Sequence, residues 1–438
     1  MSDFKKNQLQ KSLGLSFNIA VLIGGTIGVG ILRTPGTIAE MLSNYWLIIA
    51  SWLFGGLYVL LGANSYAELA TMLPKAGGSY NYIKRAFGEY AGFLSGWFDY
   101  ITNVIPPAFY CIVISEYIII LFPSLANYSA VMAISLLLAF VLIHLSGVKN
   151  GSVIQQITSL LKVICFVALV VACFMYSGIE TAPIKTDSSF FQIGLIFGFF
   201  KSLQLIIGTY NGWNSVCFFA EENDDPSKNI PRSLYSGVLL VMSIYVLVNA
   251  AFFHVLPIET LAKSNLAAAD VAKILFGENG ALIVTIISIF SLISILNAFM
   301  MIPPRILYGL SRDGFFIEKG TQVNKGGTPI VALLVSSLFS LFLICIGSFE
   351  VLFSFAAFIS IIVWGLAYFS LLKLRTKEPD LPRPYRSFWY PWTTIIAIIF
   401  SIALLAGFIY SDPKSFIIIV GITVVSYPLF LVLTRNKK

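Results

Sequence analysis

Charged residues are scarce in this sequence, which has 11% Asp, Glu, Lys and Arg over 438 residues, while 58% of its residues are hydrophobic. Soluble domains carry roughly a quarter charged residues, so this composition excludes an ordinary soluble protein. No polar domain and no linker rich in Pro, Ser or Gly separates the apolar stretches. We therefore expect one membrane domain over residues 1–438.

Cysteine and histidine are also rare, with five and two residues. The cysteines fall within apolar stretches without metal-ligand spacing, so neither a disulfide framework nor a metal site is predicted. His144 and His254 stand on apolar segments with no Asp or Glu at helical spacing. An integral-membrane enzyme needs a convergent catalytic cluster, and a channel needs a filter motif or a ring of like charges. We expect neither class, and no cofactor.

Long apolar runs occupy the sequence instead, each near the roughly 20 residues that an α-helix needs to cross a bilayer. We predict an all-α polytopic membrane protein with twelve spans, at 14–40, 46–72, 87–122, 126–146, 153–176, 191–220, 232–256, 278–310, 328–347, 350–373, 392–411 and 415–434. The first run follows a basic segment but is too long for a signal peptide, so we expect it to remain as a span.

The net charge of +7 is explained by topology rather than by nucleic acid. With the amino terminus in the cytoplasm, twenty Lys and Arg residues fall on the cytoplasmic side. The outer loops hold four, at Lys185, Lys263, Lys273 and Lys414. This positive-inside bias predicts a multi-pass protein of the cell membrane with both termini in the cytoplasm. The lipid bilayer is its expected surrounding, and no nucleic-acid partner is expected.

Glycine interrupts two of the predicted spans. The stretch "GTIGVGILRTPG" (25–36) lies in the first span, and "IIGTYNGWNS" (206–215) lies in the sixth. The breaks are five spans apart, in the first and sixth spans. Because five is odd, two successive sets of five spans enter the membrane with opposite orientations. We expect inverted repeats at 14–176 and 191–373, followed by two additional helices at 392–434. Broken helices at corresponding positions of two halves indicate the central binding site of a transporter.

An unwound helix at mid-membrane is stable only where something polar satisfies its backbone groups. Donors for a carboxylate are expected at the start of the outer half-helix, at Gly28, Val29 and Gly30. Acceptors for an ammonium group are expected at the carbonyls around Gly208, Thr209 and Asn211. The alternative is that these glycines are close-packing surfaces between helices. Two breaks five spans apart favour a binding site for a zwitterion, and neither stretch has the spacing of a nucleotide loop.

Three stretches resemble the amino acid-polyamine-organocation superfamily: "PKAGGSYNYIKRAFGEYAGFLSGW" (74–97), "GTYNGWNSVCFFAEENDDPSKNIPRSL" (208–234) and "LNAFMMIPPRILYGLSRDGFF" (296–316). The resemblance covers the first ten spans and is greatest to the L-type amino acid transporter branch and its bacterial alanine-serine-cysteine exchangers. It implies the five-plus-five inverted fold of the leucine transporter with helices 1 and 6 broken. It also implies an amino acid whose carboxylate meets Gly28, Val29 and Gly30, and whose amino group meets carbonyls near Thr26, Gly208, Thr209 and Asn211.

The same resemblance implies roles for further residues. Lys162, in the fifth span, would occupy the place of a coupling sodium ion and tether the inner half of the first span, which predicts sodium independence. Its alternative role is to extend to the headgroups near the end of the span. Many relatives carry a gating aromatic where this chain has Gly208, so the gate is expected at Tyr210, Phe200 or Trp213.

Two expectations concern loops and span ends. Animal L-type transporters pair with a glycoprotein through a cysteine in the outer loop after the third span, and the corresponding loop "FPSLANYS" (122–129) has none. No disulfide-linked heavy subunit is therefore expected. Near span ends, Arg305 is expected to extend to the headgroups, and Glu221 and Glu222 to form the solvated exit of the sixth span.

Together these patterns predict a sodium-independent exchanger of small neutral L-amino acids, such as alanine, serine and cysteine, that works by alternating access. The alternative within transport is a proton-coupled symporter of the same fold, in which Lys162 would gain and lose a proton. An integral-membrane enzyme is the remote alternative.

Overall fold

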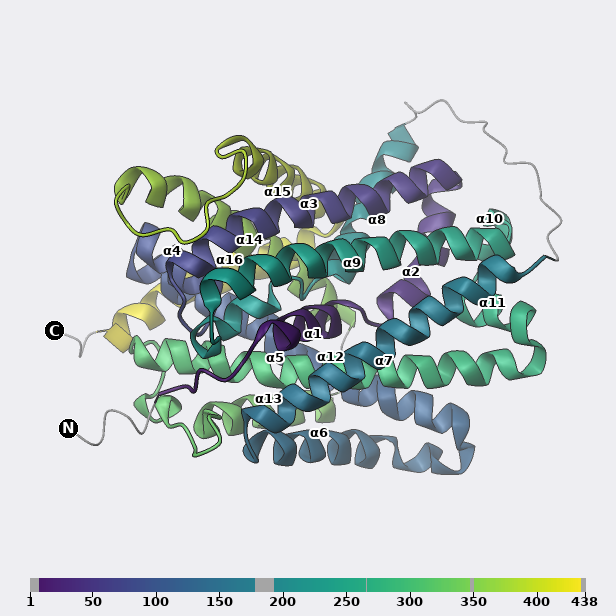
Figure 1. Ribbon diagram of the computed structural model, residues 1–438, viewed down its shortest axis with the longest axis horizontal. Helices are drawn as coiled ribbons and strands as arrows, with labels where there is room; N and C mark the ends of the chain where they lie inside the picture. Colours follow the sequence, from purple (N-terminus) through teal and green to yellow (C-terminus); the bar gives the residue numbers. More distant parts are fainter. Residues whose placement is uncertain (1–7, 178–192, 265, 347–349, 435–438) are drawn as a thin grey trace.

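The protein is described by a computed structural model over residues 8–177, 193–264, 266–346 and 350–434. Over these ranges it is helical, without strands, and its helices run mainly along the long axis of the molecule (Figure 1). Nine helical segments there are long and apolar enough to span a membrane, and the bent pair α1 and α2 makes a tenth. The prediction of an all-α polytopic membrane protein is therefore confirmed.

The helices occupy all twelve predicted ranges, and most of their ends lie within a few residues of the predicted ends. They are α1 (Leu15–Thr26) with α2 (Gly30–Leu42), α3 (Tyr45–Met72), α5 (Glu89–Leu121), α6 (Ser129–Leu145), α7 (Val148–Met175), α8 (Ile193–Tyr210) with η2 (Ser215–Glu222), α9 (Pro226–Val255), α12 (Gly280–Arg312), α13 (Ile330–Ile346), α14 (Glu350–Lys377), α15 (Trp392–Ser411) and α16 (Pro413–Thr434). Because α8 and the 17-residue α13 are not among the ten candidate spans, the count of twelve stays a prediction.

Short helices fill the connections, which the sequence analysis did not predict. They are α4 (Ser79–Phe87), η1 (Pro123–Tyr128), α10 (Ile258–Leu261), α11 (Ala267–Phe276), η3 (Gly277–Asn279) and η4 (Glu318–Thr321). Local signals set several helix ends. Asn44 caps α3 by accepting a hydrogen bond from the Leu47 N–H at 3.0 Å, and α9 begins at Pro226 after the capping residue Asp225.

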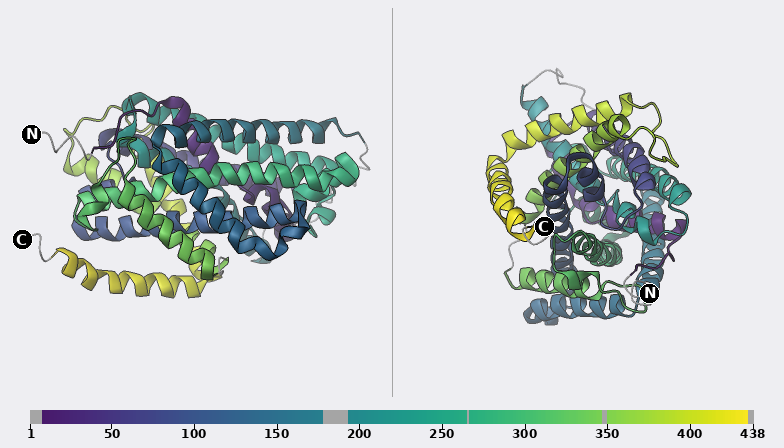
Figure 2. Two further views of the ribbon diagram at one scale, coloured as in Figure 1. Left: turned by 90° about the horizontal axis from the view of Figure 1, so that it is seen from below. Right: turned by 90° about the vertical axis from the view of Figure 1, so that its left-hand side faces the viewer.

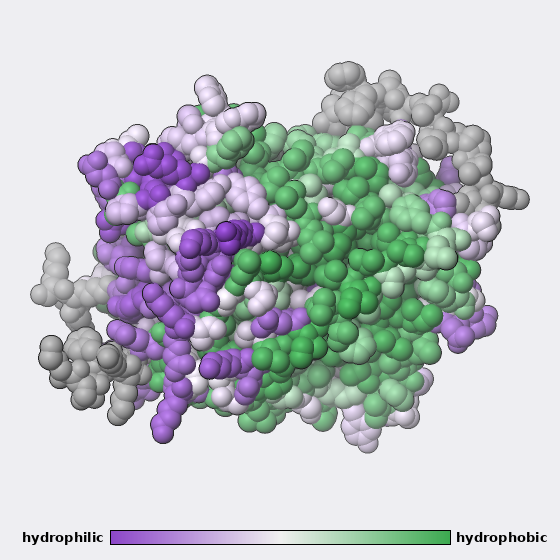
Figure 3. Space-filling model, viewed as in Figure 1, coloured by the Kyte–Doolittle hydropathy of each residue, from purple (hydrophilic) through white to green (hydrophobic). Residues whose placement is uncertain are grey.

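The arrangement places the first span at the centre of the bundle. Helix α1 packs against α7, α9 and α12. Helix α16 lies at the periphery, and most of its large apolar side chains are exposed (Figure 2). Both ends of the chain lie at the same end of the molecule, and hydrophilic residues gather there on the face seen in Figure 3. A broad apolar band covers the middle of that face, as a bilayer-embedded surface requires.

Candidate functional site

The first span is broken over three residues. Helix α1 ends at Thr26, Ile27 has extended backbone (φ −77°, ψ 110°), and α2 begins at Gly30 after a bend of 44°. No side chain caps the start of α2. Since the first N–H groups of a helix have no acceptor within it, this start offers backbone donors and the positive end of a helix dipole.

The sixth span is broken after Tyr210, where α8 ends and the chain turns into η2. Gly212 has a φ of +101°, which glycine adopts readily and other residues rarely do. A Cβ atom built on Gly212 would lie 2.3 Å from the Gly25 carbonyl oxygen. The two breaks are therefore in direct backbone contact, and only glycine fits at position 212.

A cavity of about 660 Å³ adjoins both breaks. All seven residues expected at the substrate site line it: Thr26, Gly28, Val29, Gly30, Gly208, Thr209 and Asn211. A Cβ atom on Gly208 would meet nothing within 4 Å, so this glycine widens the cavity. On Gly30, a Cβ atom would lie 2.7 Å from Thr209 Cγ2, so the two half-helices approach each other closely there.

An apolar and aromatic wall completes the cavity, and the sequence analysis missed it. Helix α5 contributes Ile105, Phe109 and Tyr110, and α12 contributes Ile295 and Phe299. The rings of Tyr110 and Phe299 are 6.0 Å apart between centroids. These residues lie on continuous apolar helices, and the local signal that could have pointed to the α5 part of the wall is the pair Pro106 and Pro107 inside that helix, of which Pro106 also lines the cavity.

The cavity extends away from the chain termini. Beyond the breaks its lining includes Arg33 of α2, Lys201 of α8 and Asp412. Asp412 follows α15, at the turn into α16, and that turn is distant from the carboxyl terminus. The cavity therefore extends toward the side opposite to the termini, and its lining residues Arg33 and Lys201 are exposed.

A buried ion pair between Arg305 of α12 and Glu222 of η2 joins these two elements on the side of the site nearer to the termini. Arg305 donates two hydrogen bonds to Glu222, at 2.8 and 2.9 Å, and both side chains are buried. The Arg305 guanidinium also lies 5.1 Å from the ring centroid of Phe219. The expectations of a headgroup-directed Arg305 and a solvated Glu222 were wrong, because η2 brings Glu222 beneath α12, where the arginine neutralises it.

Glu221 forms a second link on the same side. Its carboxylate accepts hydrogen bonds from Arg312 at 2.7 Å and from the Ala76 N–H at 2.9 Å. The exit of the sixth span is thus joined both to α12 and to the segment before α4, so Glu221 is not simply solvated.

Tyr245 of α9 joins the two breaks, and no pattern in the sequence pointed to it. Its hydroxyl oxygen lies 3.0 Å from the Thr26 carbonyl oxygen and 2.8 Å from that of Thr209, and the residue is fully buried. A tyrosine has one hydroxyl proton, which is shared between these two acceptors. Two of the carbonyls expected to meet a substrate amino group, those of Thr26 and Thr209, therefore already contact a protein donor.

Lys162 of α7 binds the end of α1. Its Nζ atom donates to the Gly24 carbonyl oxygen at 3.0 Å and also to that of Ile27. The Ser291 hydroxyl also contacts the Ile27 carbonyl, at 3.4 Å. The lysine is 1% exposed. It therefore does not extend to the headgroups but satisfies carbonyls that the break leaves without helical partners.

The polar side chains at the breaks are partly engaged by their own backbone. The Thr26 hydroxyl donates to the Leu22 carbonyl at 2.7 Å. The Asn211 amide oxygen accepts from the Gly212 N–H at 3.0 Å, while Asn211 still lines the cavity. The Thr26 hydroxyl has therefore used its one proton and can act toward a ligand only as an acceptor, whereas Asn211 retains its amide NH₂ group.

Among the described residues that line the cavity, none is a gate candidate. Tyr210 is buried against Tyr245, with ring centroids 4.9 Å apart, and its hydroxyl donates to the Trp52 carbonyl at 3.3 Å. Trp213 packs on Tyr66, with a centroid distance of 4.9 Å. Phe200 lies against α15, where a Cβ atom on Gly407 would be 3.5 Å from the ring.

Comparisons with known proteins identify the family of the chain. The amino acid permease family matches residues 13–431. The chain is 27% identical to the serine/threonine exchanger SteT of Bacillus subtilis over 440 residues, covering 98% of each protein. It is 30% identical to the large neutral amino acids transporter small subunit 2 of Rattus norvegicus over 421 residues, covering 92% of this chain and 77% of that protein. It is 28% identical to the human cystine/glutamate transporter over 450 residues, covering 99% and 87%.

These findings confirm the resemblance to the superfamily and its L-type branch. The family consists of transporters and not of enzymes. With its many apolar helices, the chain is a multi-pass membrane protein that transports amino acids. The chain belongs to the amino acid permease family.

Proposed function

We propose that this protein is a sodium-independent exchanger of small neutral L-amino acids, working by alternating access in the cell membrane with both termini in the cytoplasm. The observation that carries the proposal is the contact between two broken helices beside one cavity. Backbone donors at the start of α2 receive the carboxylate, and carbonyls at the end of α1 and α8 lie near the amino group. The substrate contacts are Thr26, Gly28, Val29, Gly30, Gly208, Thr209 and Asn211.

Sodium independence follows from Lys162. The lysine places a positive charge against carbonyl oxygens at the end of α1, where a coupling cation would otherwise find its ligands. An ammonium group fixed there supplies the charge that an ion would bring. We therefore assign Lys162 the role of a permanent tether for the inner half of the first span.

Selectivity for small neutral substrates is supported by the residues at the breaks. The seven expected contact residues at the breaks are uncharged, and the charged members of the described cavity lining are Arg33, Lys201 and Asp412. A substrate with a second charge would shed water there without compensation. Exchange is supported by the relatives of the chain, one of which is a serine/threonine exchanger.

Three further assignments belong to the proposal. The inverted repeats are residues 14–176 and 191–373, followed by two additional helices at 392–434. No disulfide-linked heavy subunit is needed. The gate candidates pack away from the cavity here, so we place the outer closure on movement of α2 and α8 toward Phe109 and Phe299 of the aromatic wall.

Transport in sealed proteoliposomes tests the proposal. Vesicles are preloaded with serine or left empty and offered labelled alanine, serine and cysteine, with and without sodium and pH gradients. Uptake that requires internal amino acid and ignores both gradients supports exchange, and uptake into empty vesicles driven by a proton gradient supports the symporter instead. Gly30→Val should abolish uptake through its contact with Thr209. Gly421→Val is the matched control, because a Cβ atom there meets nothing within 4 Å.

A further inference from the structure

A second cavity, of about 330 Å³, lies on the outside of the bundle between α3, α9 and α15. We call it the lateral groove, and its lining residues are Phe54, Leu57, Leu60, Leu61, Asn64, Tyr235, Phe388, Thr393 and Phe400. Leu57 is 50% exposed, so the groove opens to the surroundings of the protein, which in a membrane are lipid chains.

The polar groups of the groove are already satisfied. The Asn64 amide donates to the Phe388 carbonyl at 2.9 Å and to Thr393 Oγ1 at 3.0 Å. Its oxygen accepts from the hydroxyls of Tyr235 at 2.7 Å and Tyr385 at 3.2 Å, and from the Phe388 N–H at 2.9 Å. The groove therefore offers a ligand only apolar contacts, which suits a hydrocarbon chain and not a polar molecule.

The groove begins at the end of the bundle where the termini lie. Asn64 lies ten residues after Phe54 on α3, so the groove runs from Asn64 toward the bilayer centre at Phe54 over about 15 Å, at 1.5 Å per residue. That length is about half of the roughly 30 Å hydrocarbon core. It corresponds to one acyl chain of the leaflet on that side.

Two arginines stand at the polar end of the groove. Arg232 lies one helical turn before Tyr235 on α9, so both residues share a face of that helix. Arg386 follows Tyr385 in the segment between α14 and α15. Both arginines are exposed, and among the described residues neither has a carboxylate partner.

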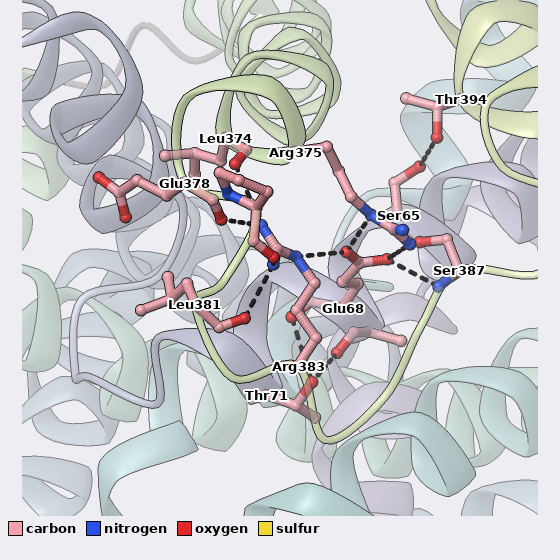
Figure 4. A network of polar contacts seen from close by, with 12 residues as sticks. Ser65, Glu68, Thr71, Leu374, Arg375, Glu378, Leu381, Arg383, Ser387 and Thr394 are labelled. Atoms are coloured by element: carbon pink, nitrogen blue, oxygen red, sulfur yellow. Dashed lines mark hydrogen bonds and ion pairs between the residues drawn. The ribbon is translucent and has the colours of Figure 1, made fainter.

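The position of Arg386 is fixed by its neighbours. Figure 4 shows the buried carboxylate of Glu68, on α3, held by Arg375 and Arg383 and by the backbone of Ser387. The Ser387 N–H donates to Glu68 at 2.7 Å. With Tyr385 bound to Asn64 on one side and Ser387 to Glu68 on the other, the backbone of Arg386 is held next to the polar end of the groove.

Exposed aromatic rings also lie at the polar end of the groove. Phe388 and Trp389 stack with centroids 5.1 Å apart, and Trp389 and Trp392 are 72% and 68% exposed. Tryptophan is enriched where the bilayer meets water, at the depth of the headgroups. The polar end of the groove thus lies where a lipid phosphate would be.

We infer that the lateral groove binds one anionic phospholipid of the leaflet on the side of the termini. One acyl chain occupies the groove along α3, and the headgroup is held by Arg232 and Arg386. Neutral phospholipids would fit the groove but gain nothing from the two charges. This site goes beyond the proposed transport function and does not depend on which amino acid is carried.

Lipid retention by the purified full-length protein tests the inference. Native mass spectrometry compares added phosphatidylglycerol and phosphatidylcholine with matched acyl chains. We expect preferential binding of one phosphatidylglycerol, weakened on the order of tenfold in Arg232→Gln/Arg386→Gln because two charges are lost near the membrane surface. The matched control is Lys149→Gln/Lys319→Gln, which removes two exposed charges from the same side of the protein.

A second pair of variants tests the groove itself. Leu57→Trp fills it and should lose most of the bound lipid with both arginines intact. Leu247→Trp, at an α9 residue that is 47% exposed and outside the groove, should retain it. Equal retention of the two lipids, or unchanged binding in either the arginine or the Leu57 variant, would overturn the inference. Because the readout is bound lipid and not uptake, failure of the exchanger proposal would leave this result unaffected.

Discussion

Gly212 and Gly25 meet where the broken first and sixth spans touch, and a Cβ atom on Gly212 would come within 2.3 Å of the Gly25 carbonyl oxygen. This contact joins the two segments that must move relative to each other in alternating access. It also explains why neither stretch could be built as an uninterrupted helix with ordinary side chains.

Gly212→Ala should therefore be strongly damaging. The alanine would clash with backbone, which cannot rotate away, and it would have to adopt a φ of +101°. We expect exchange to fall below detection in proteoliposomes and the apparent melting temperature to drop. Gly421→Ala is the control, because a Cβ atom there meets nothing within 4 Å and the residue lies outside the cavity. A Gly212→Ala protein with normal uptake would mean that the two breaks do not touch during transport.

The helices and breaks could be predicted from the sequence because each signal is local. A membrane-length apolar run sets each span, and glycines followed by polar residues mark where Thr26 and Tyr210 end their helices. Local reasoning named six of the seven expected contact residues and the family resemblance added Thr26, and all seven line one cavity.

The remaining parts of the site depend on contacts between segments far apart in the chain. Tyr245 and Thr26 are separated by 219 positions, and a tyrosine in an apolar span carries no sign of its partner. The pairing of Glu222 with Arg305 likewise depends on η2 packing under α12. The gate candidates were chosen for their nearness to the break, but Tyr210 and Trp213 face neighbouring aromatic residues instead of the cavity.

Tyr245→Phe should slow exchange while preserving the fold. The substitution leaves the Thr26 and Thr209 carbonyls without their shared donor, at a cost of about 1–3 kcal/mol for a buried polar group left unpaired. That corresponds to roughly a tenfold or greater loss in exchange rate if the cost falls on the transporting conformations. Tyr427→Phe, at a half-exposed tyrosine of α16, is the control. Initial rates of labelled serine exchange measure the effect, and equal rates in the two variants would remove Tyr245 from the mechanism.

Lys162→Ala separates the exchanger from the symporter. If the lysine is a permanent tether, its loss leaves the Gly24 and Ile27 carbonyls without this donor and loosens the end of α1. Exchange should then slow at every pH, mainly through weaker binding on the side of the termini. Lys149→Ala, at an exposed position of the same helix, should be neutral. If Lys162→Ala changes only the pH dependence of net uptake, the proton-coupled mechanism is favoured.

The proposed topology predicts which loops are accessible from outside. On a background without native cysteines, Lys263→Cys should react with an impermeant thiol reagent in right-side-out vesicles, and Lys377→Cys should react only after permeabilisation. Both positions are exposed in the structure, so access depends on the membrane and not on burial. Labelling of Lys377→Cys in intact vesicles would contradict a cytoplasmic segment after α14.

Asn211→Asp tests whether residue 211 contacts the substrate side chain and selects among substrates. The Asn211 oxygen accepts a hydrogen bond from the Gly212 N–H at 3.0 Å, and an aspartate oxygen can keep that bond while its second oxygen replaces the amide NH₂ beside the cavity. The turn should therefore fold unchanged, with one negative charge added where a substrate side chain would lie.

A carboxylate at this position would favour a cationic substrate, because an ion pair shielded from water is stronger than one at the surface. A small neutral substrate would leave the same charge unpaired at mid-membrane, which is unfavourable. We expect Asn211→Asp to gain labelled arginine or lysine exchange and to lose alanine or serine rate. Asn211→Ala is the control, because it removes the amide without adding charge. If Asn211→Asp still binds alanine but gains no arginine exchange, residue 211 does not contact the substrate side chain.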